Sequence, residues 1–203
     1  MKKLIIAPIL IALVFVSYKP IFAKNERKSE KNNSLVHPVE FHISDGNYMI
    51  RSSVPDRRFL DLNSRRNGNQ CIMRGIGSTR GDVTWITRIS PPIFGISPGF
   101  YTFENLQFGT FLESNYQLIT ANGNRVQGWQ RLSSPTPRDH QEWFISAASV
   151  IVEGNQTFRI SNAKDPNMCL DANTGQSDSP VLLKHNNGNN TSANSQLFTF
   201  VRQ

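Results

Sequence analysis

Residues 158–200 read FRISNAKDPNMCLDANTGQSDSPVLLKHNNGNNTSANSQLFTF, and the same pattern of residue types occurs three times in the chain. The segment opens on an aromatic residue, continues to an apolar pair followed by a carboxylate, and ends on a large apolar residue between polar ones. The three openers begin at Tyr48, Tyr101 and Phe158, 53 and 57 residues apart. A period of this length indicates one supersecondary unit used three times.

The carboxylate and the closing residue of each segment can be aligned between the repeats. The carboxylates are Asp61, Glu113 and Asp171, and they fall 11, 10 and 11 positions after the third residue of each opener. We align the three closing residues, each large and apolar, as Trp85, Trp143 and Leu197. Large aromatic residues at such positions are typical of a core, so we expect these closing side chains to be buried.

The fold class follows from the spacing of apolar residues. Short apolar stretches alternate with turn-rich ones such as Arg66-Asn-Gly-Asn, and no window has helical spacing for three turns. Alternation such as Val83 with Trp85 indicates half-buried strands. We therefore expect an all-β domain over residues 41–203, in which three modules of a few strands close into a threefold barrel and leave no free edge.

The first 40 residues are expected to lie outside this domain. Residues 1–23 have a basic start and an apolar core, Leu4 to Val16, that is short for a membrane span, as in a cleaved signal peptide. Residues 24–40 are polar and charged and are interpreted as a flexible arm. These features predict a secreted or periplasmic protein without a membrane span.

The net charge argues against a nucleic-acid partner. The formal charge of +7 falls to +4 when Lys2, Lys3 and Lys19 leave with the signal peptide, and residues 24–31 carry two of those four charges. The repeat region is nearly neutral, whereas a nucleic-acid-binding domain has a dense basic stripe.

The two cysteines, Cys71 and Cys169, leave two alternatives open. In an oxidising compartment a disulfide could join the first repeat to the last, and two free buried thiols fit the sequence equally well. The four histidines form no close-spaced ligand set with the cysteines, so we expect no metal and no other cofactor. No motif for a nucleophile, a phosphate loop or a zinc hydrolase is present, and we expect no catalytic activity.

The opener, the Leu-Asp phrase and the Gln-x-Trp-like closer resemble those of the β-trefoil of ricin B-type lectins, over about residues 46–201. The resemblance implies a single β-trefoil. Gln141-Glu-Trp143 keeps the full closing pattern. In our alignment Val83-Thr-Trp85 and Ser195-Gln-Leu197 lack the polar residue two places earlier.

The resemblance also implies a shallow sugar pocket in each repeat, formed by the carboxylate, an amide and a stacking ring. In the second repeat Glu113 takes the carboxylate place, Gln127 the amide place and Trp129 the ring place, and His140-Gln141 stand where Asn-Gln is common. Tyr116 is a second candidate ring. A sugar needs fixed acceptors for its hydroxyls and a flat surface for its apolar face.

The other two repeats depart from this pattern. The third keeps Asp171 and Asn194, but Leu182 and Lys184 occupy the amide and ring places. The first keeps Asp61, with Ile72 and Arg74 in those places. A carboxylate at each of these positions could instead cap backbone N–H groups of the following turn.

Two functions from different classes remain. The first is a lectin-like protein that binds a glycan or a host-cell surface receptor, as the binding or delivery component of a larger assembly. The second follows from a likeness to the A and C subunits of cytolethal distending toxins, in which the phrase Ile50-Arg-Ser followed by Phe59-Leu60 resembles the opening of C-type subunits. It implies a non-catalytic subunit that contacts toxin partner subunits, with residues 24–40 as a partner contact.

Overall fold

The computed structural model describes residues 43–54, 56–75, 83–90, 100–115, 122–132, 140–188 and 194–203. The expected signal peptide (1–23) and arm (24–40) lie outside the described residues. Every helix or strand within the described ranges is a β-strand, which confirms the all-β prediction. The strands are β1 (Gly46–Ser52), β2 (Phe59–Leu62), β3 (Asn69–Arg74), β4 (Thr84–Ser90), β5 (Phe100–Asn105), β6 (Phe111–Ser114), β7 (Asn124–Trp129), β8 (Trp143–Val152), β9 (Asn155–Asn162), β10 (Met168–Asp171), β11 (Ser179–Pro180), β12 (Leu182–His185) and β13 (Phe198–Arg202).

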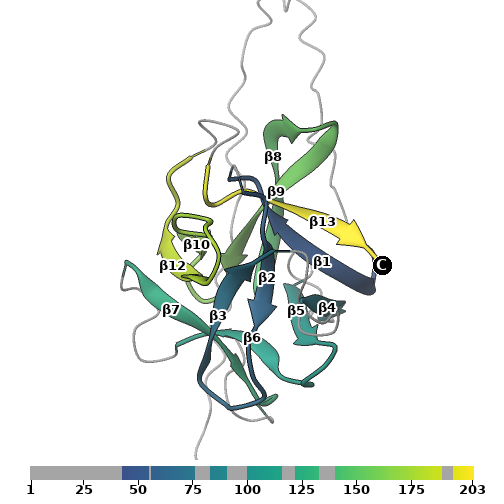
Figure 1. Cartoon of the computed structure of the whole chain (residues 1–203), viewed down its shortest axis with the longest axis vertical. Helices are drawn as coiled ribbons and strands as arrows, with labels where there is room; N and C mark the ends of the chain where they lie inside the picture. Colours follow the sequence, from purple (N-terminus) through teal and green to yellow (C-terminus); the bar gives the residue numbers. More distant parts are fainter. Residues whose placement is uncertain are drawn as a thin grey trace, which may run out of the picture. The chain divides into compact units, whose positions relative to one another are not determined.

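The first and last strands of the three modules close into a barrel. In order around it, β1 pairs with β4, β4 with β5, β5 with β8, β8 with β9, β9 with β13, and β13 returns to β1, all antiparallel. Each barrel strand therefore has a neighbour on both sides, and closure leaves none of these six with a free edge. Figure 1 shows the strands labelled in chain order.

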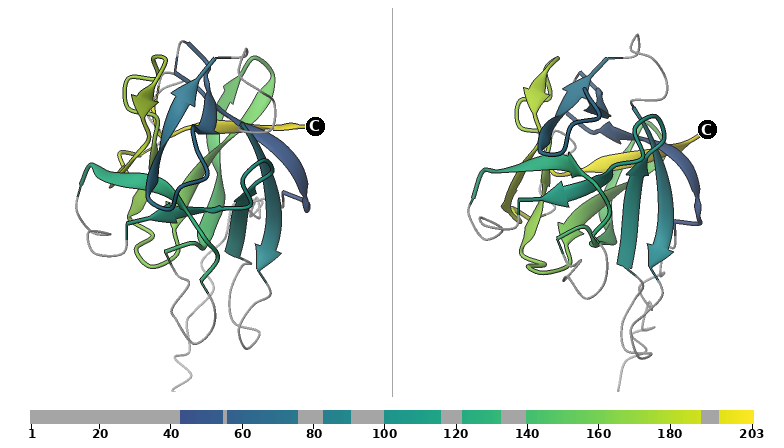
Figure 2. Two further views of the ribbon diagram at one scale, coloured as in Figure 1. Left: turned by 60° about the horizontal axis from the view of Figure 1, so that its bottom comes forward. Right: turned by 90° about the horizontal axis from the view of Figure 1, so that it is seen from below.

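The middle strands of each module form a hairpin, and the three hairpins are joined to one another. The hairpins are β2–β3, β6–β7 and β10–β12. They meet through the pairs β3–β7, β7–β12 and β3–β11. In Figure 2 the first module is blue, the second runs from teal to green and the third from green to yellow. A six-stranded barrel with three linked hairpins is the arrangement of a β-trefoil, so the predicted trefoil is confirmed for the described residues.

The barrel register corrects our alignment of the third closer by one residue. Trp85 lies opposite Asn105 and Trp143 lies opposite Asn162, the last residues of the second and third openers. The residue opposite Ser52, the last residue of the first opener, is Phe198 rather than its neighbour Leu197. Leu197 is fully buried, as predicted, but Phe198 is the counterpart of the two tryptophans. Two adjacent apolar residues satisfy the same hydrophobic pattern, so the pattern does not fix which of them is equivalent to Trp143.

The glutamine of the closer supports the corrected register. Gln141 donates from Nε2 to the carbonyl of Gln130 (2.9 Å), and its Oε1 accepts from the backbone amide of the residue two positions after Gln130 (3.2 Å). Gln196 donates in the same way to the carbonyl of His185 (2.8 Å) and accepts from the backbone amide of the residue two positions after His185 (3.0 Å). The third repeat therefore keeps its closing glutamine, and of the three closers only the first, with Val83, lacks it.

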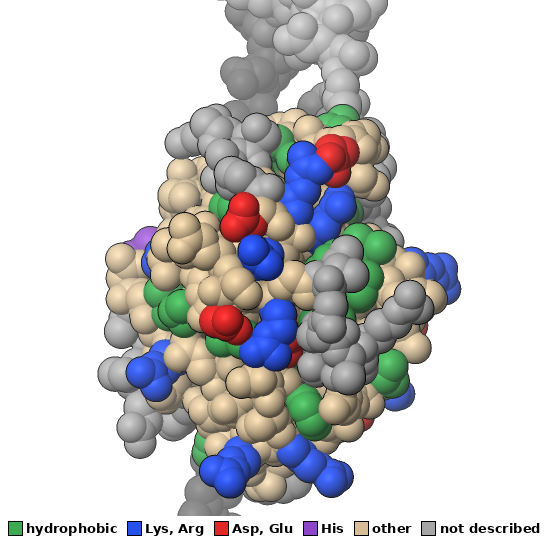
Figure 3. Space-filling model, viewed as in Figure 1, with side chains coloured by type: hydrophobic (Ala, Val, Ile, Leu, Met, Phe, Trp, Pro, Cys, Tyr) green, Lys and Arg blue, Asp and Glu red, His purple; other side chains and the backbone are tan. Residues whose placement is uncertain are grey.

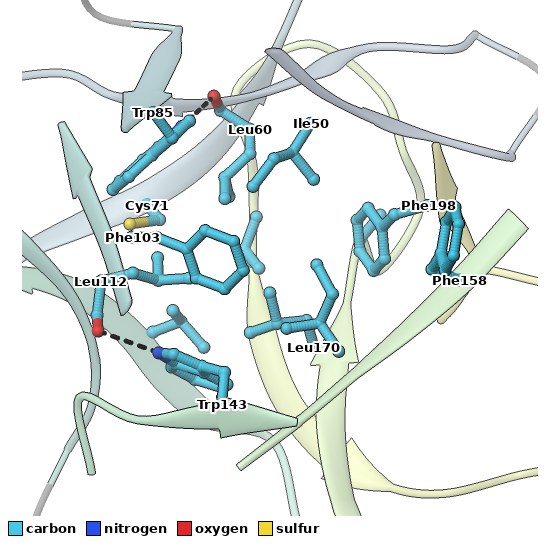
Figure 4. Packing of buried hydrophobic residues seen from close by; sticks show 14 of the residues in the cluster. Ile50, Leu60, Cys71, Trp85, Phe103, Leu112, Trp143, Phe158, Leu170 and Phe198 are labelled. Atoms are coloured by element: carbon cyan, nitrogen blue, oxygen red, sulfur yellow. Dashed lines mark hydrogen bonds between the residues drawn. The ribbon is translucent and has the colours of Figure 1, made fainter. Parts of the chain in front are cut away.

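Three equivalent sets of side chains meet at the centre of the domain. All nine have no exposed surface: Ile50, Phe103 and Ile160 from the openers, Leu60, Leu112 and Leu170 before the carboxylates, and Trp85, Trp143 and Phe198 from the closers. Figure 4 shows most of them converging. Trp85 donates from Nε1 to the carbonyl of Leu60 (3.0 Å) and Trp143 to that of Leu112 (3.1 Å), so each indole N–H is satisfied within the core.

Both cysteines are free, buried thiols, so the first of the two alternatives, a disulfide between Cys71 and Cys169, does not form. Burial raises the pKa of the Cys71 thiol well above its ordinary range, and the charge of Asp61 raises it further. Burial also raises the pKa of Cys169 to about 11, against the opposing effect of Arg159. Thiols that stay protonated are poor nucleophiles, and these two act as small apolar side chains.

Candidate functional site

The β6–β7 hairpin brings three of the predicted site residues onto one face. Glu113 lies opposite Gln127, and Phe111 lies opposite Trp129. Residues directly opposite each other share a face, and side chains two apart along a strand do too. Glu113, Gln127 and Trp129 therefore lie together, on the face opposite to the one from which Leu112 enters the core.

The carboxylate of Glu113 is held by two side-chain amides. Gln127 donates from Nε2 to Oε1 (3.0 Å), and Gln141 donates from Nε2 to Oε2 (2.9 Å). Nε2 of His140 lies 3.7 Å from Oε2. The structure thus gathers three of the predicted site residues around the carboxylate of a fourth, Glu113, which is 4% exposed. An ionised carboxylate offers about four acceptor positions, so each oxygen keeps capacity for another donor.

The pKa of the Glu113 carboxyl is raised above its ordinary value, and burial is the main cause. The hydrogen bonds from Gln141 and Gln127 and the neighbouring His140 act in the opposite direction, because they favour the charged form. The carboxylate is therefore desolvated but held in a fixed orientation. An acceptor of this kind does not have to reorganise when a hydroxyl group approaches it.

Trp129 lies in a different environment from the two core tryptophans. Its side chain is partly exposed, whereas Trp85 and Trp143 are fully buried. Its ring packs against the turn between β2 and β3, where a Cβ on Gly68 would lie 3.3 Å from the indole and the φ of +79° favours glycine. The backbone amide of Gln130 donates to Oδ1 of Asn67 in the same turn (2.8 Å). The neighbouring module therefore fixes the orientation of Trp129.

In the first repeat a cation occupies the place of the ring and reaches the carboxylate. Asp61 lies opposite Ile72 and is fully buried. Nε of Arg74 lies 3.3 Å from Oδ2 of Asp61, and the same guanidinium donates to Asp178 at 3.1 Å. This carboxylate is neutralised from within the protein, and Arg74 stands where the second repeat has the ring of Trp129.

The carboxylate of the third repeat is also paired with a cation of its own hairpin. Asp171 lies opposite Leu182. Nζ of Lys184 is 3.2 Å from Oδ1 of Asp171, and this oxygen also accepts from the backbone amide of Asn173 (2.6 Å). Ser195 donates from Oγ to the other oxygen (3.0 Å). Asp171 therefore caps the turn that follows it and pairs with a lysine, which agrees with the structural role left open by the sequence.

No hydrogen bond joins Asn194 to Asp171 among the described residues, and the role of Asn194 in a sugar site stays a prediction. Nδ2 of Asn194 donates to Asn187 (3.0 Å) and to the carbonyl of Gly188 (2.9 Å), and its Oδ1 accepts from the amide of Gln196 (2.8 Å). It supports the loop before the last strand. Ser195 takes the place beside the carboxylate because it precedes Gln196, as His140 precedes Gln141.

Two features of the site were not predicted from the sequence. Asn67 and Gly68 come from another module, and nothing in the pattern of the second repeat indicates that they support Trp129. Tyr116, the second candidate ring, lies outside the described residues.

Within the described ranges, no three His, Cys, Asp or Glu side chains gather as metal ligands would. The same part of the chain contains no helix with the length and apolar character to cross a bilayer.

No family model and no curated protein matches the sequence. Solved structures do match. The Rhizoctonia solani agglutinin has a TM-score of 0.59 and 18% identity, covering 81% of this chain and 100% of its own. The Macrolepiota procera ricin B-like lectin in complex with lactose has a TM-score of 0.56 and 20% identity, covering 80% and 99%. A mosquitocidal holotoxin has a TM-score of 0.60 and 20% identity over 80% of this chain and 18% of its own. At these identities the similarities show the shared fold.

Proposed function

We propose that this chain is a secreted, lectin-like β-trefoil protein that binds carbohydrate through the second of its three repeats. The observation that carries the proposal is the contrast between the three carboxylates. Asp61 is paired with Arg74 and Asp171 with Lys184, whereas Glu113 is held by two neutral amides with Trp129 on the same face.

The arrangement around Glu113 has the chemistry that a sugar requires. A sugar hydroxyl can donate to a carboxylate oxygen that keeps acceptor capacity, and the apolar face of the ring can cover the partly exposed indole of Trp129. In the other two hairpins a bound sugar would have to displace a cation from its carboxylate and would find no ring at the equivalent position. Lectins of the same fold, one of them bound to lactose, support this assignment.

A single shallow pocket binds weakly. A simple sugar held by one carboxylate and one ring is expected to have a dissociation constant of about 1 mM, or about 4 kcal/mol. Useful binding to a cell surface then requires several pockets presented together, through oligomers or a partner protein. We therefore assign the chain the role of a binding or delivery component in a larger assembly, without catalytic activity of its own.

A second candidate function rests on the carboxylates of the first and third repeats, both of which are paired with cations of the protein. Their carboxylates stabilise the domain through Arg74 and Lys184 and offer nothing further to a sugar, which leaves those surfaces for protein contacts. A non-catalytic subunit of a toxin resembling the cytolethal distending toxins would use the fold in this way. Deletion of residues 24–40 would then weaken capture of a co-encoded partner subunit, and full capture by the truncated chain would contradict this function.

The carbohydrate-binding function is tested with variants at the ring position of two repeats. Trp129→Ala should abolish binding to a glycan array, and Trp129→Phe should retain part of it because a flat ring remains. The matched control is Lys184→Ala, which changes the equivalent position of the third repeat and should leave glycan binding intact. Thermal unfolding of each variant shows whether it is folded. Unchanged binding by a folded Trp129→Ala protein would refute the proposal.

A further inference from the structure

The second-repeat hairpin carries arginines on the same face as the candidate sugar site. Along β7 the side chains on this face are those of Arg125, Gln127 and Trp129, since exposure alternates along the strand. Arg131, two residues further on, is exposed and lies over the ring of Phe111, with Cζ 5.3 Å from the ring centroid. Phe111 lies opposite Trp129, so Arg131 covers a ring on the hairpin face that also carries the indole.

The neighbouring module adds two more arginines. Arg65 and Arg66 are exposed in the turn between β2 and β3, which contains Gly68 and packs against the ring of Trp129. The amide of Gly68 also donates to the carbonyl of Gly128 (2.9 Å), so the turn and the hairpin are held together by backbone contacts. The hairpin face with Trp129 therefore carries Arg125 and Arg131, and the adjoining turn of another module carries Arg65 and Arg66.

These four differ from most of the other cations in the described part of the chain. Six cations there lie within 4 Å of a carboxylate: Arg51, Arg57, Arg58, Arg74, Arg88 and Lys184. Arg65, Arg66, Arg125 and Arg131 have no carboxylate at that distance among the described residues. Figure 3 shows both situations on one face: some blue side chains lie against red ones, and others at its lower end have none beside them.

From this arrangement we infer that the ligand of the second-repeat site is an acidic oligosaccharide, in which a neutral sugar stacks on Trp129 and a neighbouring carboxylate or sulfate group binds the arginines. The inference rests on the proposed function and names its substrate class. A guanidinium binds planar or tetrahedral oxyanions through paired N–H groups. A neutral glycan would supply no such group to any of the four guanidiniums.

The length of the site fits a ligand of more than one sugar unit. At about 3.3 Å per residue along β7, Arg125 at one end of the strand lies about 13 Å from Trp129, and Arg131 follows the other end of the strand. One sugar ring above Trp129 would not reach both ends. The acidic group is expected beside the ring rather than over Glu113, because a second negative charge next to that desolvated carboxylate would be repelled.

The test compares sugars that differ only in one acidic group. Isothermal titration or surface plasmon resonance measures the full chain with lactose, with sialylated lactose and with sulfated lactose. We expect about three- to tenfold tighter binding of at least one acidic form, and an advantage that shrinks as salt rises from 50 to 300 mM, because exposed ion pairs are screened. The two acidic forms distinguish a carboxylate from a sulfate.

Variants test whether these arginines cause the preference for acidic over neutral sugars. In the double variant R125Q/R131Q the ratio of acidic to neutral affinity should fall to about one. The control R88Q removes a cation that faces Glu104 on the barrel and should leave both affinities unchanged. A duplex oligonucleotide serves as a third probe: if it binds as tightly as the acidic sugars and loses its affinity in R125Q/R131Q, the site is a general polyanion surface and the inference is overturned.

The two proposals fail in different ways. Equal affinity for lactose and both acidic forms, with binding lost in Trp129→Ala, overturns the acidic ligand and leaves the sugar site intact. No binding of any of these sugars at millimolar concentration overturns the sugar site itself. A preference for acidic sugars that persists in a folded R125Q/R131Q protein assigns the preference to other residues and also overturns the inference.

Discussion

The guanidinium of Arg74 lies against the buried carboxylate of Asp61, with Nε 3.3 Å from Oδ2. The side chain of Asp61 has no exposed surface, whereas that of Arg74 is 28% exposed, so the arginine brings a charge to the carboxylate and keeps part of itself in solvent. This contact fills the position that an aromatic ring occupies in the second repeat. The carboxylate of Asp61 is therefore paired with a cation of the domain and is not open to a ligand.

Removal of the arginine should destabilise the domain. Arg74→Gln leaves Asp61 buried without its cation, and we expect the free energy of unfolding to fall by about 1–3 kcal/mol. Chemical denaturation measures this loss. The matched control is Arg88→Gln, since Arg88 is 59% exposed and lies 3.9 Å from Glu104; an exposed pair of this kind contributes at most about 1 kcal/mol. Equal losses in both variants would contradict the role given to the Arg74–Asp61 pair.

The corrected register of the third closer predicts that Gln196 is a structural residue. Gln196→Ala removes a buried side chain that donates to His185 and accepts from Asn187, so both backbone groups lose their partner. We expect a loss of about 1–3 kcal/mol in the free energy of unfolding. Gln176→Ala, at an exposed position, should stay within about 0.5 kcal/mol of the parent protein. If the two changes cost the same, the equivalence of Gln196 with Gln141 loses its support.

Two glycines with similar backbone angles should respond differently to alanine. Gly154 has a φ of +75° and open space where a methyl group would lie, so Gly154→Ala should cost about 1 kcal/mol from backbone strain alone. Gly175 has a φ of +70°, and a methyl there would overlap the side chain of buried Val54. Gly175→Ala should therefore cost clearly more, about 2–4 kcal/mol. Urea denaturation of the pair decides this, and similar midpoints would argue against close contact between Gly175 and Val54.

The raised pKa of Glu113 predicts a pH dependence of stability. The native state keeps the proton of Glu113 to a higher pH than the unfolded chain, in which the pKa is near 4.5. As pH rises from that value through the native pKa, the unfolded chain binds fewer protons than the native state, so the contribution of Glu113 to the free energy of unfolding falls; above the native pKa it is constant. Glu113→Gln removes this contribution.

The measurement is the difference in free energy of unfolding between the parent protein and Glu113→Gln, taken from pH 4 to 8. We expect the difference to move in favour of the variant as pH rises through the native pKa of Glu113 and then to level off. A difference that stays constant over this range, or that moves in favour of the parent protein, would show that burial does not raise the pKa of this carboxyl.

Much of the fold could be predicted because it depends on local patterns repeated three times. The spacing of opener, apolar pair and carboxylate identified Leu60, Leu112 and Leu170 as equivalent, and all three are fully buried. One error arose where two apolar residues are adjacent: only the pairing of Phe198 with Ser52 shows that Phe198, rather than Leu197, takes the closing position. The loops before the closers differ in length, so counting along the chain could not detect this.

The grouping of side chains around Glu113 was predicted in part, and the role of this group in binding a sugar stays a prediction. Glu113, Gln127 and Trp129 were identified from one hairpin, and Gln141 from the closer of the same repeat. Arg74 and Lys184 reach their carboxylates within their own hairpins, but other contacts come from further along the chain. Gly68 supports Trp129 from the neighbouring module, and Asn194 turned out to support a loop while Ser195 reaches Asp171.

The sequence alone determined that three β-modules bury a common apolar centre, because strand periodicity and repeat spacing are written in residues close together in the chain. The tertiary structure decided which groups reach each carboxylate: a cation at Asp61 and Asp171, and two amides at Glu113. It also placed the turn between β2 and β3 against the ring of Trp129. Charge and hydrogen bonding act over a few ångströms, and only folding brings residues about 60 positions apart, such as Asn67 and Gln130, within that distance.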